Sequence, residues 1–181
     1  MLRADGGEGD RGMTTIDGAG RYRVLFVCSG NTCRSPTAHG LLRQRLRAAG
    51  LAERIAVDSA GTHGQHAGDP PDPRSRAEAM RRGLDIADLR SRELTAADFT
   101  GHDLYVAMDD GHVRFLTARL PAERHAAVRL LLTFAPDAGR ADVPDPYYGG
   151  PADYRLSYDL IERGVDGLVG HLRVVVDRGG S

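Results

Sequence analysis

The sequence predicts an α/β fold in which a central, four-stranded parallel sheet is flanked by helices on both faces. Short apolar segments rich in β-forming residues alternate with segments of helical spacing, as in a parallel sheet with crossover helices. The 181 residues suffice for one domain with a sizeable core. We therefore expect a single domain over residues 21–181. Residues 1–20 are Gly-rich and polar, cannot bury much apolar area, and are expected to form a disordered tail.

The expected elements follow in regular order. In the first helical segment, Leu41, Leu42 and Leu46 share one face, Pro36 is expected at the first helical position, and Gly50 ends the helix. Short apolar runs predict the strands. The expected strands are 23–27, 55–59, 103–107 and 127–133, and the expected helices are 37–49, 74–82, 96–99, 110–119 and 152–176.

Composition excludes several classes of protein. The formal net charge of −1 argues against a general nucleic-acid binder. No run of residues approaches the roughly 18 apolar residues of a membrane span, and the first residues lack the apolar segment of a secretory signal. Cys28 and Cys33 are too close in sequence for a structural disulfide to stabilise much. We expect free thiols in a cytoplasmic protein that is a monomer and does not insert into membranes.

Residues 28–34 carry the features of an anion-binding site. Cys28 ends the first apolar run, and after five further residues Arg34 stands at the entrance of a helix. Ligands of parallel α/β sheets bind beyond the carboxyl ends of strands, near helix N-termini. Arg34 can bind two phosphate oxygens in a fork. The backbone N–H groups of the intervening loop can surround the anion; its residues are Ser29, Gly30, Asn31, Thr32 and Cys33.

The residue types in this loop also suit covalent chemistry. The thiolate is the nucleophilic form of cysteine, and it is favoured at Cys28 by the surrounding N–H groups, the helix N-terminus and Arg34. Gly30 and Asn31 tolerate the left-handed backbone that a tight anion nest needs. Ser35 can hydrogen-bond to the Cys28 sulfur and so favour the thiolate as a leaving group.

The segment from Val24 to Pro36 resembles the phosphate-binding loop of the low-molecular-weight protein tyrosine phosphatases. The similarity continues through motifs at 58–62, 71–74, 107–109 and 142–150 and covers about residues 22–172. It implies a three-layer sandwich of flavodoxin-like or Rossmann-like topology with strand order 2-1-3-4. It also implies phosphotyrosine proteins as substrates, a cognate tyrosine kinase as a partner, and a reaction that needs neither a cofactor nor a metal.

The resemblance assigns the chemical roles. It makes Cys28 the nucleophile, which forms a phosphocysteine, and Arg34 the residue that binds phosphate and stabilises the transition state. Asp145, in a Pro-bracketed loop, is implied as the general acid and base. Asp142 is close in sequence and is an alternative acid. For Cys33 two interpretations stay open: a reversible disulfide with Cys28 under oxidation, or packing beneath the loop.

The resemblance also places the pocket and its support, with three departures. Tyr147 and Tyr148 are implied as an aromatic wall, and Ser59 joins Asn31 in a hydrogen-bond network that holds the loop. Gln65 lines the opposite wall, where many members have Trp. Two further departures are Leu89, where many members have a His that supports the loop Asn, and His39, where the family usually has Glu.

Three other functions remain open. Thr32 stands where tyrosine-specific relatives usually have Ile and resembles the protein-arginine phosphatase subgroup, whereas the pair Tyr147 and Tyr148 resembles the tyrosine-specific branch. Thioredoxin-coupled arsenate reduction is disfavoured because no cysteine follows Cys33. A non-catalytic redox sensor or phosphoprotein binder would be expected to lose Cys28, Arg34 or Asp145, and all three are present.

Overall fold

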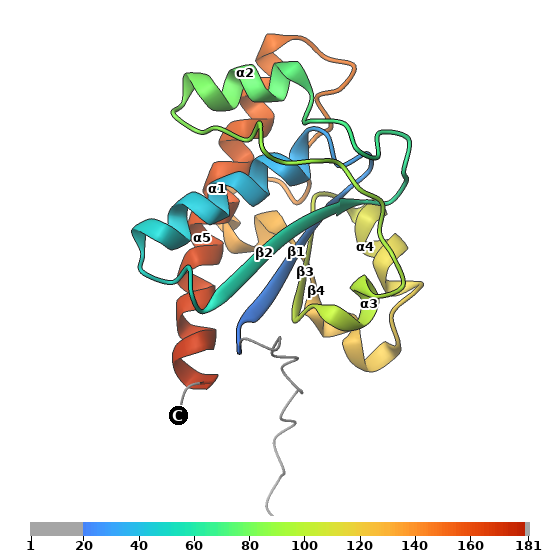
Figure 1. Ribbon diagram of the computed structural model, residues 1–181, viewed down its shortest axis with the longest axis vertical. Coiled ribbons are helices and arrows are strands. Elements are labelled where there is room, and N and C mark those ends of the chain that lie inside the picture. The colour runs from blue at the N-terminus through green and yellow to red at the C-terminus, as the bar shows by residue number, and fades with distance from the viewer. Residues whose placement is uncertain (1–19, 180–181) are drawn as a thin grey trace, which may run out of the picture.

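The computed structural model describes residues 20–179 (Figure 1). Apart from Gly20, the tail expected over residues 1–20 lies outside the described residues. Four parallel strands form the sheet, in the order β2-β1-β3-β4, which confirms the expected topology. The strands are β1 (Tyr22–Cys28), β2 (Ile55–Gly61), β3 (Leu104–Ala107) and β4 (Val128–Leu130).

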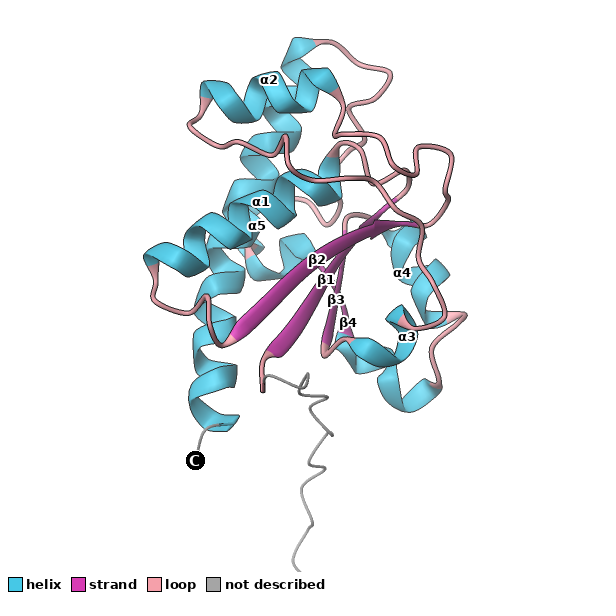
Figure 2. Cartoon of the chain, viewed as in Figure 1, coloured by secondary structure: helices cyan, strands magenta, loops and turns pink. Residues whose placement is uncertain are grey.

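Helices cover both faces of the sheet, so the three-layer arrangement is as predicted (Figure 2). One face carries α1 (Arg34–Ala48) and the long α5 (Pro151–Gly179), and α2 (Pro73–Arg81) packs against α5. The other face carries α3 (Asp98–Gly101) and α4 (Asp110–Thr117). Short 3₁₀ helices occupy Ala122–Ala127, Leu131–Phe134 and Pro136–Ala138. Within residues 20–179, no helix combines the length and the apolar character needed to cross a membrane.

Strand β1 lies in the middle of the core. Its side chains alternate between the two faces of the sheet, as the period of a β-strand requires. Val24, Phe26 and Cys28 belong to the apolar cluster beneath α1 and α5. Leu25 and Val27 belong to the second cluster, which includes Leu116 of α4. Because β1 is buried on both sides, the residue that ends it is held firmly at the carboxyl edge of the sheet.

Several expected boundaries were wrong by one to three residues, and two of them have a physical explanation. Helix α1 begins at Arg34, so Pro36 is its third residue rather than its first. The first four N–H groups of a helix have no intrahelical partner, so a proline in the first turn costs no hydrogen bond. The fourth strand ends at Leu130 instead of continuing to residue 133. There Leu131 and Leu132 begin a 3₁₀ helix that packs on α5, and both leucines are buried in it.

Candidate active site

The loop between β1 and α1 curls at the carboxyl edge of the sheet. Asn31 has a φ of 55°, in the left-handed region that was expected for this loop. Gly30 does not adopt a positive φ, contrary to expectation. Glycine suits this position for a steric reason instead: a Cβ there would lie 3.2 Å from Cδ2 of His66, which is a tight contact. The loop thus packs directly against the segment that follows β2.

Cys28 and Ser35 face each other across this loop. The sulfur of Cys28 lies 3.0 Å from Oγ of Ser35, which confirms the predicted contact. Asn31 Nδ2 donates a hydrogen bond to the same Ser35 oxygen at 2.8 Å. Since the bond from Asn31 does not use the Ser35 hydroxyl hydrogen, that hydrogen is free to be donated to the sulfur, as a Cys28 thiolate would require. Cys28 is only 3 % exposed, so this hydrogen bond is largely shielded from bulk solvent.

Asn31 is held by three further hydrogen bonds. Its Nδ2 donates to Ser59 Oγ at 3.0 Å, which confirms the predicted contact with Ser59. Its Oδ1 accepts from the backbone N–H of Arg92 at 3.0 Å, and its carbonyl oxygen accepts from Ser91 Oγ at 2.6 Å. Ser91 and Arg92 were not predicted from the sequence, because their contacts form only when the segment after α2 returns to the loop.

Arg34 is buried beneath the pocket and is held by two carboxylates and a carbonyl. Its Nη1 donates to Asp109 Oδ2 at 2.7 Å and to the carbonyl oxygen of Val143 at 3.0 Å. Its Nη2 lies 3.4 Å from Asp145 Oδ2. Arg34 is 3 % exposed, whereas the Asp145 side chain is 47 % exposed. The guanidinium is thus oriented from below and meets Asp145 at the rim.

Asp109 and His112 form a second support that the sequence analysis missed. Burial opposes ionisation of Asp109, but the hydrogen bond from Arg34 and the neighbouring His112 lower its pKa overall. Burial lowers the pKa of His112 to about 4, so its imidazole is neutral near neutral pH. The Asp109 backbone N–H donates to His112 Nδ1 at 3.3 Å, so the Nε2 hydrogen can be donated to Ser29 Oγ, 3.0 Å away.

A sequence pattern could have indicated this pair. Asp109 is the second residue after β3 and caps α4, with His112 at the third helical position in a capping box. Since β1 and β3 are neighbouring parallel strands, residues that follow them lie at the same edge of the sheet. Position alone therefore places Asp109 near Cys28.

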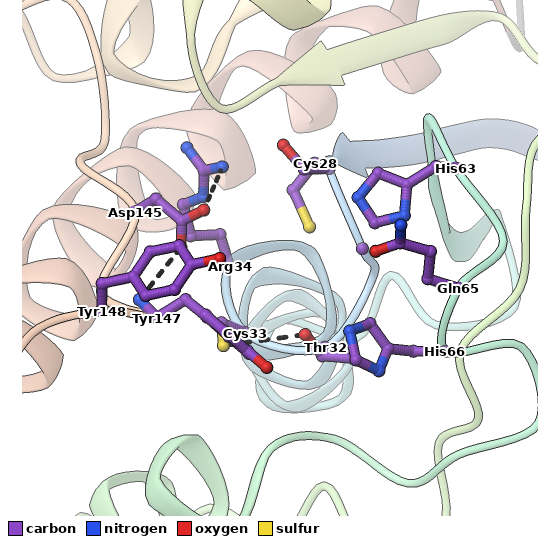
Figure 3. A pocket seen from close by; sticks show the side chains of 12 residues that line it. Cys28, Thr32, Cys33, Arg34, His63, Gln65, His66, Asp145, Tyr147 and Tyr148 are labelled. Carbon is purple, nitrogen blue, oxygen red and sulfur yellow. Dashed lines mark hydrogen bonds and ion pairs between the residues drawn. The ribbon is translucent and has the colours of Figure 1, made fainter.

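The pocket above Cys28 has a volume of about 190 Å³. Figure 3 shows the sulfur of Cys28 between two walls of different chemistry. Asp145, Tyr147 and Tyr148 lie on one side, and the other side is formed by His63, Gln65 and His66. The structure thus brings together the predicted Cys28, Arg34, Asp145, Tyr147, Tyr148 and Gln65, along with Ser29, Gly30, Thr32 and Cys33 of the loop.

The aromatic wall is fixed from the side of α2. The rings of Tyr147 and Tyr148 meet edge to face with centroids 5.0 Å apart. The Arg74 guanidinium lies 5.4 Å from the Tyr147 ring centroid and donates to its backbone oxygen at 3.0 Å. Tyr148 is 97 % exposed, so it stands at the mouth of the pocket. Asp142 is not part of the pocket lining; its carboxylate accepts from the Asp110 N–H at 3.2 Å.

Cys33 lies beneath the loop and is 6 % exposed. Its sulfur is 3.8 Å from Oγ1 of Thr32 and 3.9 Å from the hydroxyl of Tyr154. Burial is the main cause that raises the pKa of this thiol. Both cysteines are free, and the redox role of Cys33 stays a prediction.

The opposite wall also contains two histidines that were not predicted as pocket residues from the sequence. His63 and His66 flank Gln65, and His66 lies 3.6 Å (Nδ1 to Oδ2) from Asp69. Within residues 20–179, no three His, Cys, Asp or Glu side chains are grouped as ligands for a metal ion. The reactive groups around the pocket are therefore the Cys28 thiol, the buried Arg34 guanidinium and the Asp145 carboxylate at the rim. Together they surround a space that can hold an anion.

Known proteins resemble this chain over most of its length. Residues 23–177 match the family model of the low molecular weight phosphotyrosine protein phosphatases. A low molecular weight protein-tyrosine-phosphatase of Streptomyces coelicolor is 43% identical, over 86% of this chain and 96% of the relative. Two solved structures superpose with a TM-score of 0.80: a protein tyrosine phosphatase from Entamoeba histolytica, 33% identical over 84% of this chain and 97% of that one, and YfkJ from Bacillus subtilis, 32% identical over 84% and 95%. The chain therefore belongs to the low molecular weight phosphotyrosine protein phosphatase family.

Proposed function

We propose that this protein hydrolyses phosphotyrosine in proteins through a phosphocysteine on Cys28. The observation that carries the proposal is the juxtaposition of three groups in one pocket: the Cys28 sulfur hydrogen-bonded to Ser35, the buried Arg34 guanidinium, and the Asp145 carboxylate 3.4 Å from it. Family membership supports the hydrolysis of a phosphate ester. The Tyr147 and Tyr148 rings at the pocket mouth support an aromatic substrate.

In the first step, the Cys28 thiolate attacks phosphorus in line with the bond to the tyrosine oxygen. The S–P bond forms as the P–O bond breaks, and Asp145 transfers its proton to the departing phenol oxygen. Arg34 and the loop N–H groups stabilise the negative charge on the three equatorial oxygens. Asp109 and Val143 hold the guanidinium in place for this task.

In the second step, the Asp145 carboxylate accepts a proton from water as the water oxygen attacks phosphorus. The S–P bond breaks, inorganic phosphate is released, and the sulfur leaves as a thiolate. The Ser35 hydroxyl, 3.0 Å from that sulfur, favours the departure by donating a hydrogen bond to the developing charge. A tyrosine kinase that phosphorylates the same substrates would be the functional partner.

Rapid quenching with a ³²P-labelled phosphotyrosine peptide tests the covalent step. We expect the label to appear on the peptide that contains Cys28, in a burst before steady turnover, and to appear much more slowly in Asp145→Ala, which lacks the proton donor of the first step. Cys28→Ser should carry no label and should lose measurable turnover. Full turnover by Cys28→Ser would overturn the proposal. Asp142→Ala is the matched control, because Asp142 does not line the pocket.

Thr32 keeps a second candidate function in view, the hydrolysis of phosphoarginine. It is 8 % exposed and lines the pocket. A side chain at this position, whether threonine or a substituted residue, can therefore contact the bound phosphoryl group. Turnover of matched phosphotyrosine and phosphoarginine peptides decides between the two, and a large preference for phosphoarginine would overturn the choice of tyrosine. Thr32→Ile should lower any phosphoarginine activity and leave phosphotyrosine turnover nearly unchanged.

A further inference from the structure

His39 is a buried imidazole that the proposed chemistry does not use. It lies on α1, is 8 % exposed, and does not line the pocket. Its Nδ1 is 3.1 Å from Oγ of Ser59, the residue that also contacts Asn31. Leu89, buried in the same core, offers no hydrogen-bonding side chain to this network.

The charge state of His39 follows from its surroundings. Burial lowers the pKa of His39 to about 4 and outweighs the charged groups that face it. Two of these groups, Asp58 and Asp88, favour the charged imidazole, while the other two, Arg43 and Arg92, oppose it. His39 is thus neutral near neutral pH, and a neutral imidazole has one nitrogen that can accept a hydrogen bond.

The hydrogen bonds of Asn31 set the direction of the whole network. One amide hydrogen goes to Ser35 and the other to Ser59, so both serine oxygens are acceptors. Each serine hydroxyl hydrogen is therefore left to donate elsewhere. For Ser35 the neighbour is the Cys28 sulfur at 3.0 Å. For Ser59 the neighbour is His39 Nδ1 at 3.1 Å.

The opposite tautomer of His39 does not fit this arrangement. With a hydrogen on Nδ1, Ser59 Oγ would accept from both Asn31 and His39, and the Ser59 hydroxyl hydrogen would lose the acceptor that lies 3.1 Å away. A buried donor without a partner is costly. The geometry therefore favours Nδ1 as the acceptor.

We propose that His39 is a positioning residue for Cys28, acting through Ser59, Asn31 and Ser35. The bare Nδ1 accepts the Ser59 hydroxyl hydrogen, which keeps the Ser59 oxygen turned toward Asn31. Asn31 is then held with one amide hydrogen on Ser35, and the Ser35 hydroxyl hydrogen stays directed at the sulfur. This proposal rests on the proposed function in one respect only: the proposed function makes the Cys28 thiolate the nucleophile.

The test measures Cys28 itself, without substrate. The rate of alkylation by iodoacetamide is followed against pH, with the modified cysteine located by mass spectrometry. In His39→Leu we expect alkylation at mildly acidic pH to slow by about fivefold, the effect of one lost hydrogen bond, and the curve to move to higher pH. In His39→Asn, whose Oδ1 can accept near the place of Nδ1, we expect a rate within about twofold of the native protein.

Two further variants keep the test decisive. Ser59→Ala removes the hydrogen bond to His39 and also the acceptor of Asn31 Nδ2, so it should slow alkylation at least as much as His39→Leu, also if His39→Leu fails to fold. His171→Leu is the control, because that histidine packs on Phe134 of another part of the fold. A native curve for His39→Leu or Ser59→Ala would overturn the inference. Equal slowing in folded His39→Leu and His39→Asn would also overturn it, because packing volume would then be the cause.

The result of the alkylation test can be distinguished from the result of the test of the proposed function. Absence of a phosphocysteine in the quench experiment would reject the covalent mechanism but would leave the alkylation curves to decide the hydrogen-bond network. Conversely, unchanged curves together with a labelled Cys28 would reject the role of His39 alone.

Discussion

The Asp145 carboxylate lies 3.4 Å from the Arg34 guanidinium, measured from Oδ2 to Nη2. The contact joins the loop before α5 to the first residue of α1, two segments far apart in sequence. Arg34 is bound more tightly on its other side, with Asp109 at 2.7 Å. The two carboxylates therefore have different positions around Arg34. Asp109 orients the guanidinium from below, whereas Asp145 contacts it at the rim of the pocket.

Asp145→Asn should slow turnover of phosphotyrosine peptides by about 10² to 10⁴, because the leaving oxygen loses its proton donor. Substrates with a more acidic phenol, such as a nitrophenyl phosphate, should be affected less, since they need less protonation. Steady-state kinetics across a series of aryl phosphates measure this. Asp142→Asn, with its carboxylate on the Asp110 N–H instead, should stay near native. A uniform loss over the whole series would contradict the assignment.

Asp109→Asn should weaken binding of inorganic phosphate and lower kcat/KM by about tenfold to a hundredfold. The charge-assisted bond to Arg34 is lost, and such bonds contribute roughly 1.5 to 3 kcal/mol. Competitive inhibition by phosphate measures the effect directly. The matched control is Asp110→Asn, which removes a neighbouring carboxylate that pairs with exposed Arg114. The interpretation fails if both variants bind phosphate equally well.

The predictable part of the fold rests on local patterns. A central strand is buried on both faces, and this requires a continuous apolar run such as that from Val24 to Val27. The run therefore predicted β1 and placed Cys28 at its end. The fourth strand was predicted too long because an apolar run of Leu residues does not distinguish an edge strand from a 3₁₀ turn that packs on a helix.

The site was predictable where its residues are consecutive, and less so where contacts are distant. Cys28 to Ser35 share one loop, and spacing alone suggested their contacts. The support from Asp109, His112 and Arg92 depends on how three segments meet at the sheet edge, which periodicity does not encode. His39 looked like a simple replacement in sequence, yet the structure places it against Ser59.

Gly61→Ala should reduce activity by about 10²-fold through a shift of the phosphate loop. A Cβ at this position would lie 2.6 Å from the carbonyl oxygen of Ser29 and 3.1 Å from the backbone nitrogen of Asn31, so backbone must move. Kinetics with a phosphotyrosine peptide, beside circular dichroism to verify folding, measure the loss. Gly170→Ala is the control: a Cβ there meets nothing within 4 Å, and alanine should stabilise α5 by about 1 kcal/mol. Native activity in Gly61→Ala would show that the loop tolerates displacement.

Asp98→Asn should destabilise the protein by about 2 kcal/mol near neutral pH, with the difference shrinking in acid. Burial alone would raise the pKa of Asp98, but hydrogen bonds from Arg92 and Thr95 outweigh burial and lower the pKa to about 2. A carboxyl group whose pKa is lowered by folding stabilises the native state above its unfolded pKa. That contribution is lost as the pH falls from about 4 to about 2.

Urea unfolding of the native protein and of Asp98→Asn, at several pH values, measures this difference. Asp137→Asn breaks an exposed pair with Arg163 and should change stability by less than about 1 kcal/mol. Because Arg92 also binds Asn31 through its backbone N–H, Asp98→Asn should loosen the phosphate loop as well. We expect faster amide exchange at Arg92 in the variant. A stability difference that stays constant down to the lowest pH would show that Asp98 acts through packing and not through its charge.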